Sequence, residues 1–113
     1  MLLRAMPVFF WLSLALVTVL ALMPGPAVPH ALLFWDKAQH SLAFAVLAIS
    51  GCLAFPNNLR CLCLGLITHG AVIEILQSAL CRTRYGEVSD WLADGLGVLI
   101  GLWLYKKWIR YHA

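Results

Sequence analysis

Polar side chains able to do chemistry lie in three short segments of an otherwise apolar sequence. Those that could belong to one ligand site are Asp36, Lys37, His40, Glu74, Gln77, Arg84, Asp90 and Asp94. An imidazole beside carboxylates can transfer protons, and Lys and Arg can bind a phosphate or a carboxylate. Charged groups persist in apolar surroundings where they pair or act on something. The expected chemistry is therefore acid–base exchange or anion binding.

The first segment places a carboxylate, an ammonium and an imidazole on one face of an expected helix. At about 100° per residue, Asp36 and His40 are about 40° apart, and Lys37 and His40 are about 60° apart. Phe44 continues this face deeper into the helix. Ordinary helix-start chemistry is the alternative for Asp36, as a cap or first-turn acid, and for Lys37, which would extend toward the membrane surface. His40 lies a turn further in, where capping does not explain it.

The second segment carries Glu74 and Gln77, which are three residues apart and share a face. At about 1.5 Å per residue, Glu74 lies on the order of 10 Å inside the end of its helix. A carboxylate there is expected to take up a proton or to meet a cation, with His40, Arg82 and Arg84 as candidates. A structural hydrogen bond to a neighbouring helix is the alternative. His69, about 140° round the same helix from Glu74, is expected to be a neutral core or helix-contact histidine, with a place in the site as the alternative.

The third segment places two acids on a face that also carries two glycines. Ser89 or Asp90 is expected to cap the helix, whereas Asp94 lies a full turn inside and cannot act as a cap. Asp94 shares its face with Gly97 and Gly101, a pair of small residues four apart that lets another helix approach closely. The sequence therefore predicts that Asp94 points into protein.

The composition shows which environment these segments occupy. Of 113 residues, 63% are hydrophobic and 12% are charged, and the mean hydropathy is +0.87. An average soluble domain is roughly half apolar and roughly a quarter charged. A chain this short could not bury so much hydrocarbon in water, which argues against a soluble enzyme, a nucleic-acid module and a disordered linker. The expected class is a membrane protein.

Four apolar runs predict an all-α, polytopic protein with four transmembrane helices in one antiparallel bundle. The helices are expected at about 5–23, 37–55, 61–80 and 91–108, within a single domain that covers 1–113. Short loops predict that sequence neighbours pack as antiparallel hairpins. The first run could instead be a cleavable signal peptide, but it is long for one, and its removal would leave an odd number of spans.

The basic residues predict the orientation, because short cytoplasmic loops collect Lys and Arg. If the helices alternate, five bases fall on one side: Arg4, Arg60, Lys106, Lys107 and Arg110. The other side has three bases and all five acids: Lys37, Arg82, Arg84, Asp36, Glu74, Glu87, Asp90 and Asp94. Both termini are therefore expected in the cytoplasm of a bacterial inner membrane, with the polar cluster near the outer face.

Signatures of familiar chemistries are missing from the sequence. It has no His-Glu-x-x-His segment, no glycine-rich phosphate loop, and no Ser or Cys nucleophile motif. The four cysteines are expected to act as small apolar groups, since Cys61 and Cys63 lack a second pair of zinc ligands. We therefore expect no cofactor, no metal and no nucleic-acid partner.

Taken together, the chain resembles the VanZ-like family of small bacterial membrane proteins over nearly its whole length. The resemblance rests on the order and spacing of Asp36-Lys37-x-x-His40-x-x-x-Phe44, Glu74-x-x-Gln77, Arg84 and Asp90-x-x-x-Asp94-x-x-Gly97-x-x-x-Gly101. The family often has Asn where this chain has Asp94. Its namesake is associated with resistance to a glycopeptide of the teicoplanin type. No reaction is established for the family as a whole.

The favoured hypothesis is a site for the polar head group of an amphiphile, such as a lipid-linked wall precursor or a phospholipid. Lys37 and Arg84 would hold phosphate or carboxylate, and His40 with Glu74 or Asp90 are the candidates for acid–base work, with catalysis left open. One alternative is a structural or regulatory module whose buried charges only fix helix packing. A second is proton-coupled transport by an oligomer. The oligomeric state does not follow from the sequence.

Overall fold

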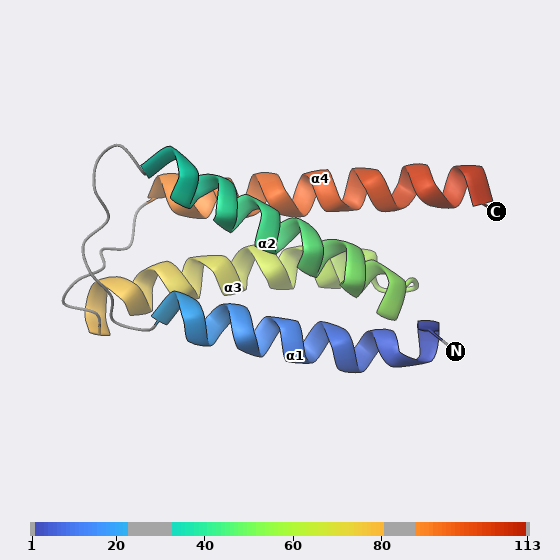
Figure 1. Ribbon diagram of the computed structural model, residues 1–113, viewed down its shortest axis with the longest axis horizontal. Coiled ribbons are helices and arrows are strands. Elements are labelled where there is room, and N and C mark those ends of the chain that lie inside the picture. The colour runs from blue at the N-terminus through green and yellow to red at the C-terminus, as the bar shows by residue number, and fades with distance from the viewer. Residues whose placement is uncertain (1, 23–32, 81–87, 113) are drawn as a thin grey trace.

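The computed structural model describes residues 2–22, 33–80 and 88–112, and almost all of them are helical. The helices are α1 (Leu2–Leu22), α2 (Leu33–Ala54), α3 (Leu59–Leu80) and α4 (Val88–His112). They run in alternating directions, so that α1 and α3 point one way and α2 and α4 the other (Figure 1). The described ranges contain no strand, and the all-helical prediction is confirmed.

Two helices begin earlier than expected, which corrects the predicted caps. α2 begins at Leu33 rather than at 37, so Asp36 lies inside the helix and does not cap it. α4 begins at Val88 rather than at 91, so Ser89 and Asp90 both lie in its first turn. The carboxylate of Asp90 in the first turn of α4 is favoured by the partial positive charge of a helix N-terminus.

The closest helix contact joins α2 to α4. A Cβ atom added at Gly97 would collide with the carbonyl oxygen of Ser41, and one added at Gly101 would lie 2.7 Å from the carbonyl oxygen of Ala45. The prediction that the glycine face admits another helix is therefore confirmed, and the partner is α2. Because the helices alternate, α2 and α4 run parallel (Figure 1). The hairpin expectation holds for α1 with α2 and for α3 with α4, whereas α2 packs more extensively on α4 than on α3.

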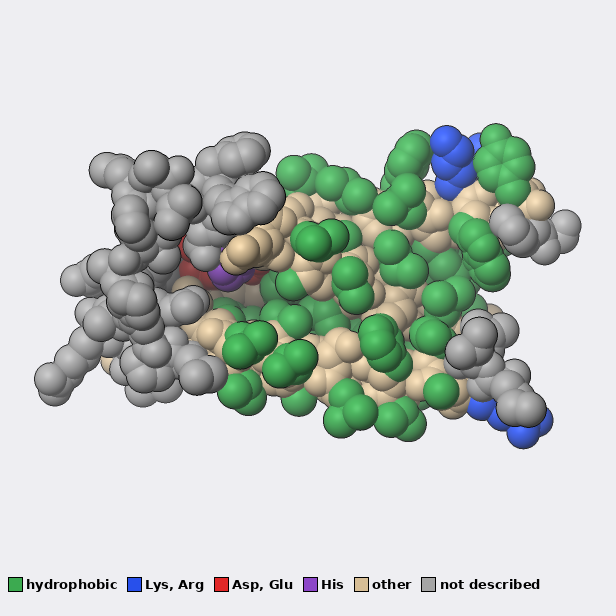
Figure 2. All heavy atoms as spheres, in the orientation of Figure 1, with side chains coloured by type: hydrophobic (Ala, Val, Ile, Leu, Met, Phe, Trp, Pro, Cys, Tyr) green, Lys and Arg blue, Asp and Glu red, His purple; other side chains and the backbone are tan. Residues whose placement is uncertain are grey.

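The interior is apolar over much of the length of the bundle, and so is much of the outer surface. Phe44, Leu47, Ile73 and Val98 are almost fully buried. Large apolar side chains also cover the outside, as the hydrophobic spheres in Figure 2 show. An extended apolar surface marks a face that meets lipid or another apolar partner.

Among the described residues, two segments are long and apolar enough to cross a membrane by themselves. They are Arg4–Leu22 in α1 and Leu59–Ala79 in α3. The apolar part of α2 is shorter, at Ala38–Ala54. Polar and basic side chains lower the hydropathy of α2 and α4, and Asp94 and His40 among them point toward protein rather than away from it.

The close approach of α2 and α4 predicts that alanine substitution at two glycines of α4 changes the stability of the protein to different extents. Gly97→Ala forces a methyl group against the backbone of α2, and we expect it to lower the free energy of unfolding by about 1–3 kcal/mol. The matched control is Gly95→Ala, because a Cβ atom there meets nothing within 4 Å. Unfolding of the purified protein in detergent, followed by circular dichroism, measures both. Equal stability of the two variants would contradict the contact.

Candidate functional site

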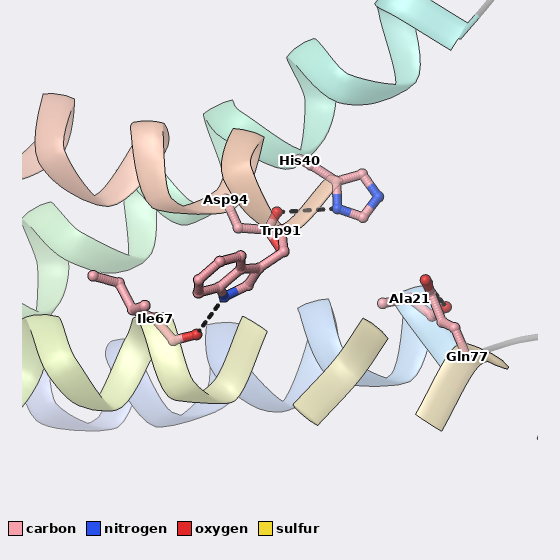
Figure 3. A network of polar contacts seen from close by, with 6 residues as sticks. All are labelled: Ala21, His40, Ile67, Gln77, Trp91 and Asp94. Carbon is pink, nitrogen blue, oxygen red and sulfur yellow. Dashed lines mark hydrogen bonds and ion pairs between the residues drawn. The ribbon is translucent and has the colours of Figure 1, made fainter. Parts of the chain in front are cut away.

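His40 and Asp94 connect α2 and α4 next to their closest contact. Nδ1 of His40 lies 3.1 Å from Oδ1 of Asp94, and the two side chains are 15% and 1% exposed. Figure 3 shows the two side chains pointing toward one another from neighbouring helices. In α3, a Cβ atom added at Gly70 would lie 3.2 Å from Oδ2 of Asp94. The lack of a side chain at Gly70 therefore leaves room for this carboxylate.

Glu74 brings a third helix into the cluster. One ligating atom each from His40, Glu74 and Asp94 lie within 4.8 Å of one another. Glu74 is 7% exposed, and Asp90 is equally buried one turn before Asp94 on α4. We call His40, Glu74 and Asp94 the polar cluster. Figure 2 shows acidic and histidine side chains near one end of the molecule.

Gln77 contacts α1, whereas its spacing from Glu74 predicted a place in the ligand site. Its side-chain Nε2 donates a hydrogen bond to the carbonyl oxygen of Ala21 at 2.7 Å (Figure 3). This amide therefore joins α3 to α1 beside the polar cluster. A role for Gln77 in ligand binding stays a prediction.

Trp91 supplies a contact that the sequence analysis did not identify. Its indole Nε1 donates to the carbonyl oxygen of Ile67 in α3 at 2.9 Å (Figure 3). Trp91 precedes Asp94 by three residues and so shares its side of α4, which is the signal that could have indicated the contact. The indole also lies beside Gly70. The same small residue thus leaves room for both Trp91 and Asp94.

His69 contacts α1. Oγ1 of Thr18 donates to the carbonyl oxygen of Leu14 at 2.7 Å, and it lies 2.8 Å from Nε2 of His69. Because the hydroxyl hydrogen is used by Leu14, Nε2 of His69 is the donor to Thr18 in this arrangement. The helix contact expected for His69 is therefore present.

The side chains of three predicted site residues lie outside the described part of the structure. Asp36 and Lys37 belong to the first turns of α2, but only their backbone is described. Arg84 is outside the described residues entirely. The cations expected to hold phosphate or carboxylate therefore stay predictions. The described part of the predicted site comes from α2, α3 and α4, with Gln77 linked to α1.

Comparison with models of known families assigns nearly the whole chain to one family. Residues 4–110 match the family described as VanZ/LLP1. The chain belongs to the VanZ/LLP1 family. Comparisons with curated proteins and with solved structures found no match. The predicted resemblance is therefore confirmed over nearly the whole sequence.

In this VanZ/LLP1 protein, the polar cluster offers two kinds of chemistry. A histidine held against a carboxylate has a fixed orientation, which suits it to accept or donate a proton or to hold an anionic group. An imidazole and two carboxylates are also a donor set that divalent transition metals accept. Both uses need the side chains to be held in place, and hydrogen bonds between helices do this around the cluster.

The indole of Trp91 is expected to stabilise the packing of α4 on α3. Trp91→Phe keeps the ring but removes the donor to Ile67, and we expect a loss of about 0.6 kcal/mol, the average for hydrogen bonds between membrane helices. Trp103→Phe is the matched control, because Trp103 is exposed on the same helix. Unfolding in detergent measures both variants. A larger effect at Trp103 than at Trp91 would contradict this role.

Proposed function

We propose that all four helices span a bacterial inner membrane, with both termini in the cytoplasm. The helices have 21, 22, 22 and 25 residues. At about 1.5 Å per residue, each exceeds the roughly 30 Å of a hydrocarbon core. The polar side chains that lower the hydropathy of α2 and α4 include His40 and Asp94, which face each other, so they need not contact lipid.

The distribution of charge supports this orientation. Arg4, Arg60, Lys106, Lys107 and Arg110 are all exposed. Figure 2 shows Lys and Arg side chains at the end of the molecule opposite the acidic and histidine side chains. Basic residues favour the cytoplasmic side. The polar cluster would then lie toward the outer leaflet.

We infer that the polar cluster binds the polar head group of an amphiphile, such as a lipid-linked wall precursor or a phospholipid. The single observation that carries this proposal is the meeting of His40, Glu74 and Asp94, from three helices, within 4.8 Å. Buried polar groups that converge from several elements are typical of ligand sites. The side chain of His40 is 15% exposed, so it is not sealed inside the protein, whereas a purely structural pair could be fully buried.

A head-group site near the outer leaflet fits an envelope role. Lipid-linked precursors and phospholipids carry phosphate in the head-group region of the membrane, and an imidazole donor can bond a phosphate oxygen. The namesake of the VanZ-like family is associated with resistance to a glycopeptide of the teicoplanin type, and this association supports the proposal. We therefore propose a link to envelope composition or glycopeptide sensitivity.

The orientation predicts which engineered cysteines an impermeant maleimide reaches in intact cells. In a variant without the native cysteines, Ser89→Cys should be labelled from outside, because it lies at the start of α4 beside the polar cluster. Tyr111→Cys, near the end of α4, should be labelled only after the membrane is permeabilised. Gel shift with a polyethylene glycol maleimide measures both. The reverse pattern would overturn the orientation.

Head-group binding predicts that variants of the polar cluster lose lipid affinity while the fold is retained. We expect His40→Ala to weaken binding roughly ten- to a hundredfold, the effect of removing one hydrogen bond to a charged group. Native mass spectrometry with phosphatidylglycerol and with a polyprenyl-linked wall precursor measures the retained lipid.

The matched control is Gln39→Ala, which alters an exposed neighbour of His40 on α2. A deletion strain complemented with each variant, scored for teicoplanin sensitivity and envelope lipids, gives the cellular readout. If His40→Ala binds both lipids like the parent protein and restores the strain, the proposed site is wrong. Loss of thermal stability with unchanged lipid binding would favour the structural alternative.

A further inference from the structure

The side chains of the polar cluster form a donor set that fits a metal ion, although the sequence contains no familiar metal-binding motif. We propose that His40, Glu74 and Asp94 bind one divalent transition-metal ion of the zinc class. This inference does not rest on head-group binding, because an ion can occupy the cluster whether or not a lipid is present. It differs from the expectation of no metal, which depended on motifs within single segments.

The distances suit a metal centre. Zinc binds nitrogen and oxygen ligands at about 2.0–2.2 Å, so adjacent ligands of a tetrahedral ion lie about 3.3–3.5 Å apart. Nδ1 of His40 and Oδ1 of Asp94 are already 3.1 Å apart. One ligating atom each of His40, Glu74 and Asp94 lies within 4.8 Å of the others. Closing these distances by at most roughly 1–1.5 Å would bring all three donors to ligand spacing.

The chemistry of the donors selects the class of ion. One imidazole and two carboxylates suit zinc and related transition metals, whereas Mg²⁺ and Ca²⁺ prefer oxygen donors alone. Glu74 and Asp94 are both buried, and a divalent cation offsets the charge that two neighbouring carboxylates would carry there. Three protein ligands leave a fourth position for water or for an anionic group.

The surroundings hold the proposed ligands in place. Asp94 and the indole of Trp91 both lie against α3 at Gly70, and the indole nitrogen is bonded to Ile67. His40 lies next to Ser41, whose carbonyl oxygen contacts α4 at Gly97. Ligands that are positioned by packing lose little freedom on binding, which favours affinity.

The separation of the ligands along the chain explains why no motif indicated them. His40, Glu74 and Asp94 come from α2, α3 and α4, at separations of 34 and 20 residues (40 to 74 and 74 to 94). Known zinc signatures place at least two ligands within one short segment. Only the packing of the three helices brings these donors together.

The test is metal binding by the purified full-length protein in detergent, after chelation and removal of the chelator. Isothermal titration with ZnCl₂ and elemental analysis should give one equivalent for the parent protein. Removing an outer partner of a metal ligand weakens binding about 10- to 100-fold, so removal of a ligand itself should weaken it by at least that factor. We expect this loss in Glu74→Gln and Asp94→Asn, which preserve side-chain shape, and in His40→Ala.

The controls separate this site from other donors. His69→Ala removes the histidine bonded to Thr18, and Cys61→Ser removes an exposed thiol, so both should retain one equivalent. Circular dichroism of each variant verifies the helices. If the parent protein binds no stoichiometric Zn²⁺, or if Glu74→Gln and Asp94→Asn bind it within twofold of the parent, the metal site is wrong. The head-group proposal is judged separately by lipid retention in metal-free buffer.

Discussion

The close approach of α2 and α4 is the constraint on which the polar cluster depends. Gly97 and Gly101 lie against the backbone of α2, and this contact fixes how far each helix is turned and shifted relative to the other. Ser41, which contacts Gly97, directly follows His40, and Asp94 precedes Gly97 by almost one turn. The packing of small residues therefore sets the imidazole opposite the carboxylate. In lipid, such van der Waals contact is a principal force between helices.

Hydrogen bonds then connect the other helices to this pair. α4 is joined to α3 by Trp91 and Ile67, and α3 is joined to α1 by Gln77 and Ala21. Each bond ends on a backbone carbonyl oxygen, so each fixes a side chain relative to the helix opposite rather than to another mobile side chain. The donors of the polar cluster are consequently held by four helices, although only three of them supply the cluster. Such prior positioning is what a binding site requires.

The sequence predicted which faces are buried better than it predicted which helices meet. Periodicity placed Asp94 with Gly97 and Gly101 on one contact face, as the structure shows. It could not identify α2 as the partner, because a small-residue pair marks a face and carries no information about its neighbour. Helix starts were also missed, at Leu33 and Val88, since the residues that precede them in the sequence, Leu32 and Glu87, are not preferred helix caps. The role of Trp91 depends on Gly70 in another helix, which no local pattern reveals.

The acid at position 94 separates the structural and chemical roles of the cluster. An Asn side chain at this position would keep an oxygen that can accept the bond from His40 with nearly the same shape. The pairing of α2 with α4 therefore tolerates either residue. A carboxylate adds negative charge at a position that is 1% exposed, where an unneeded charge is unfavourable. Packing alone gives no reason for this charge in the present chain, whereas a cationic partner, either a metal ion or protonated His40, does.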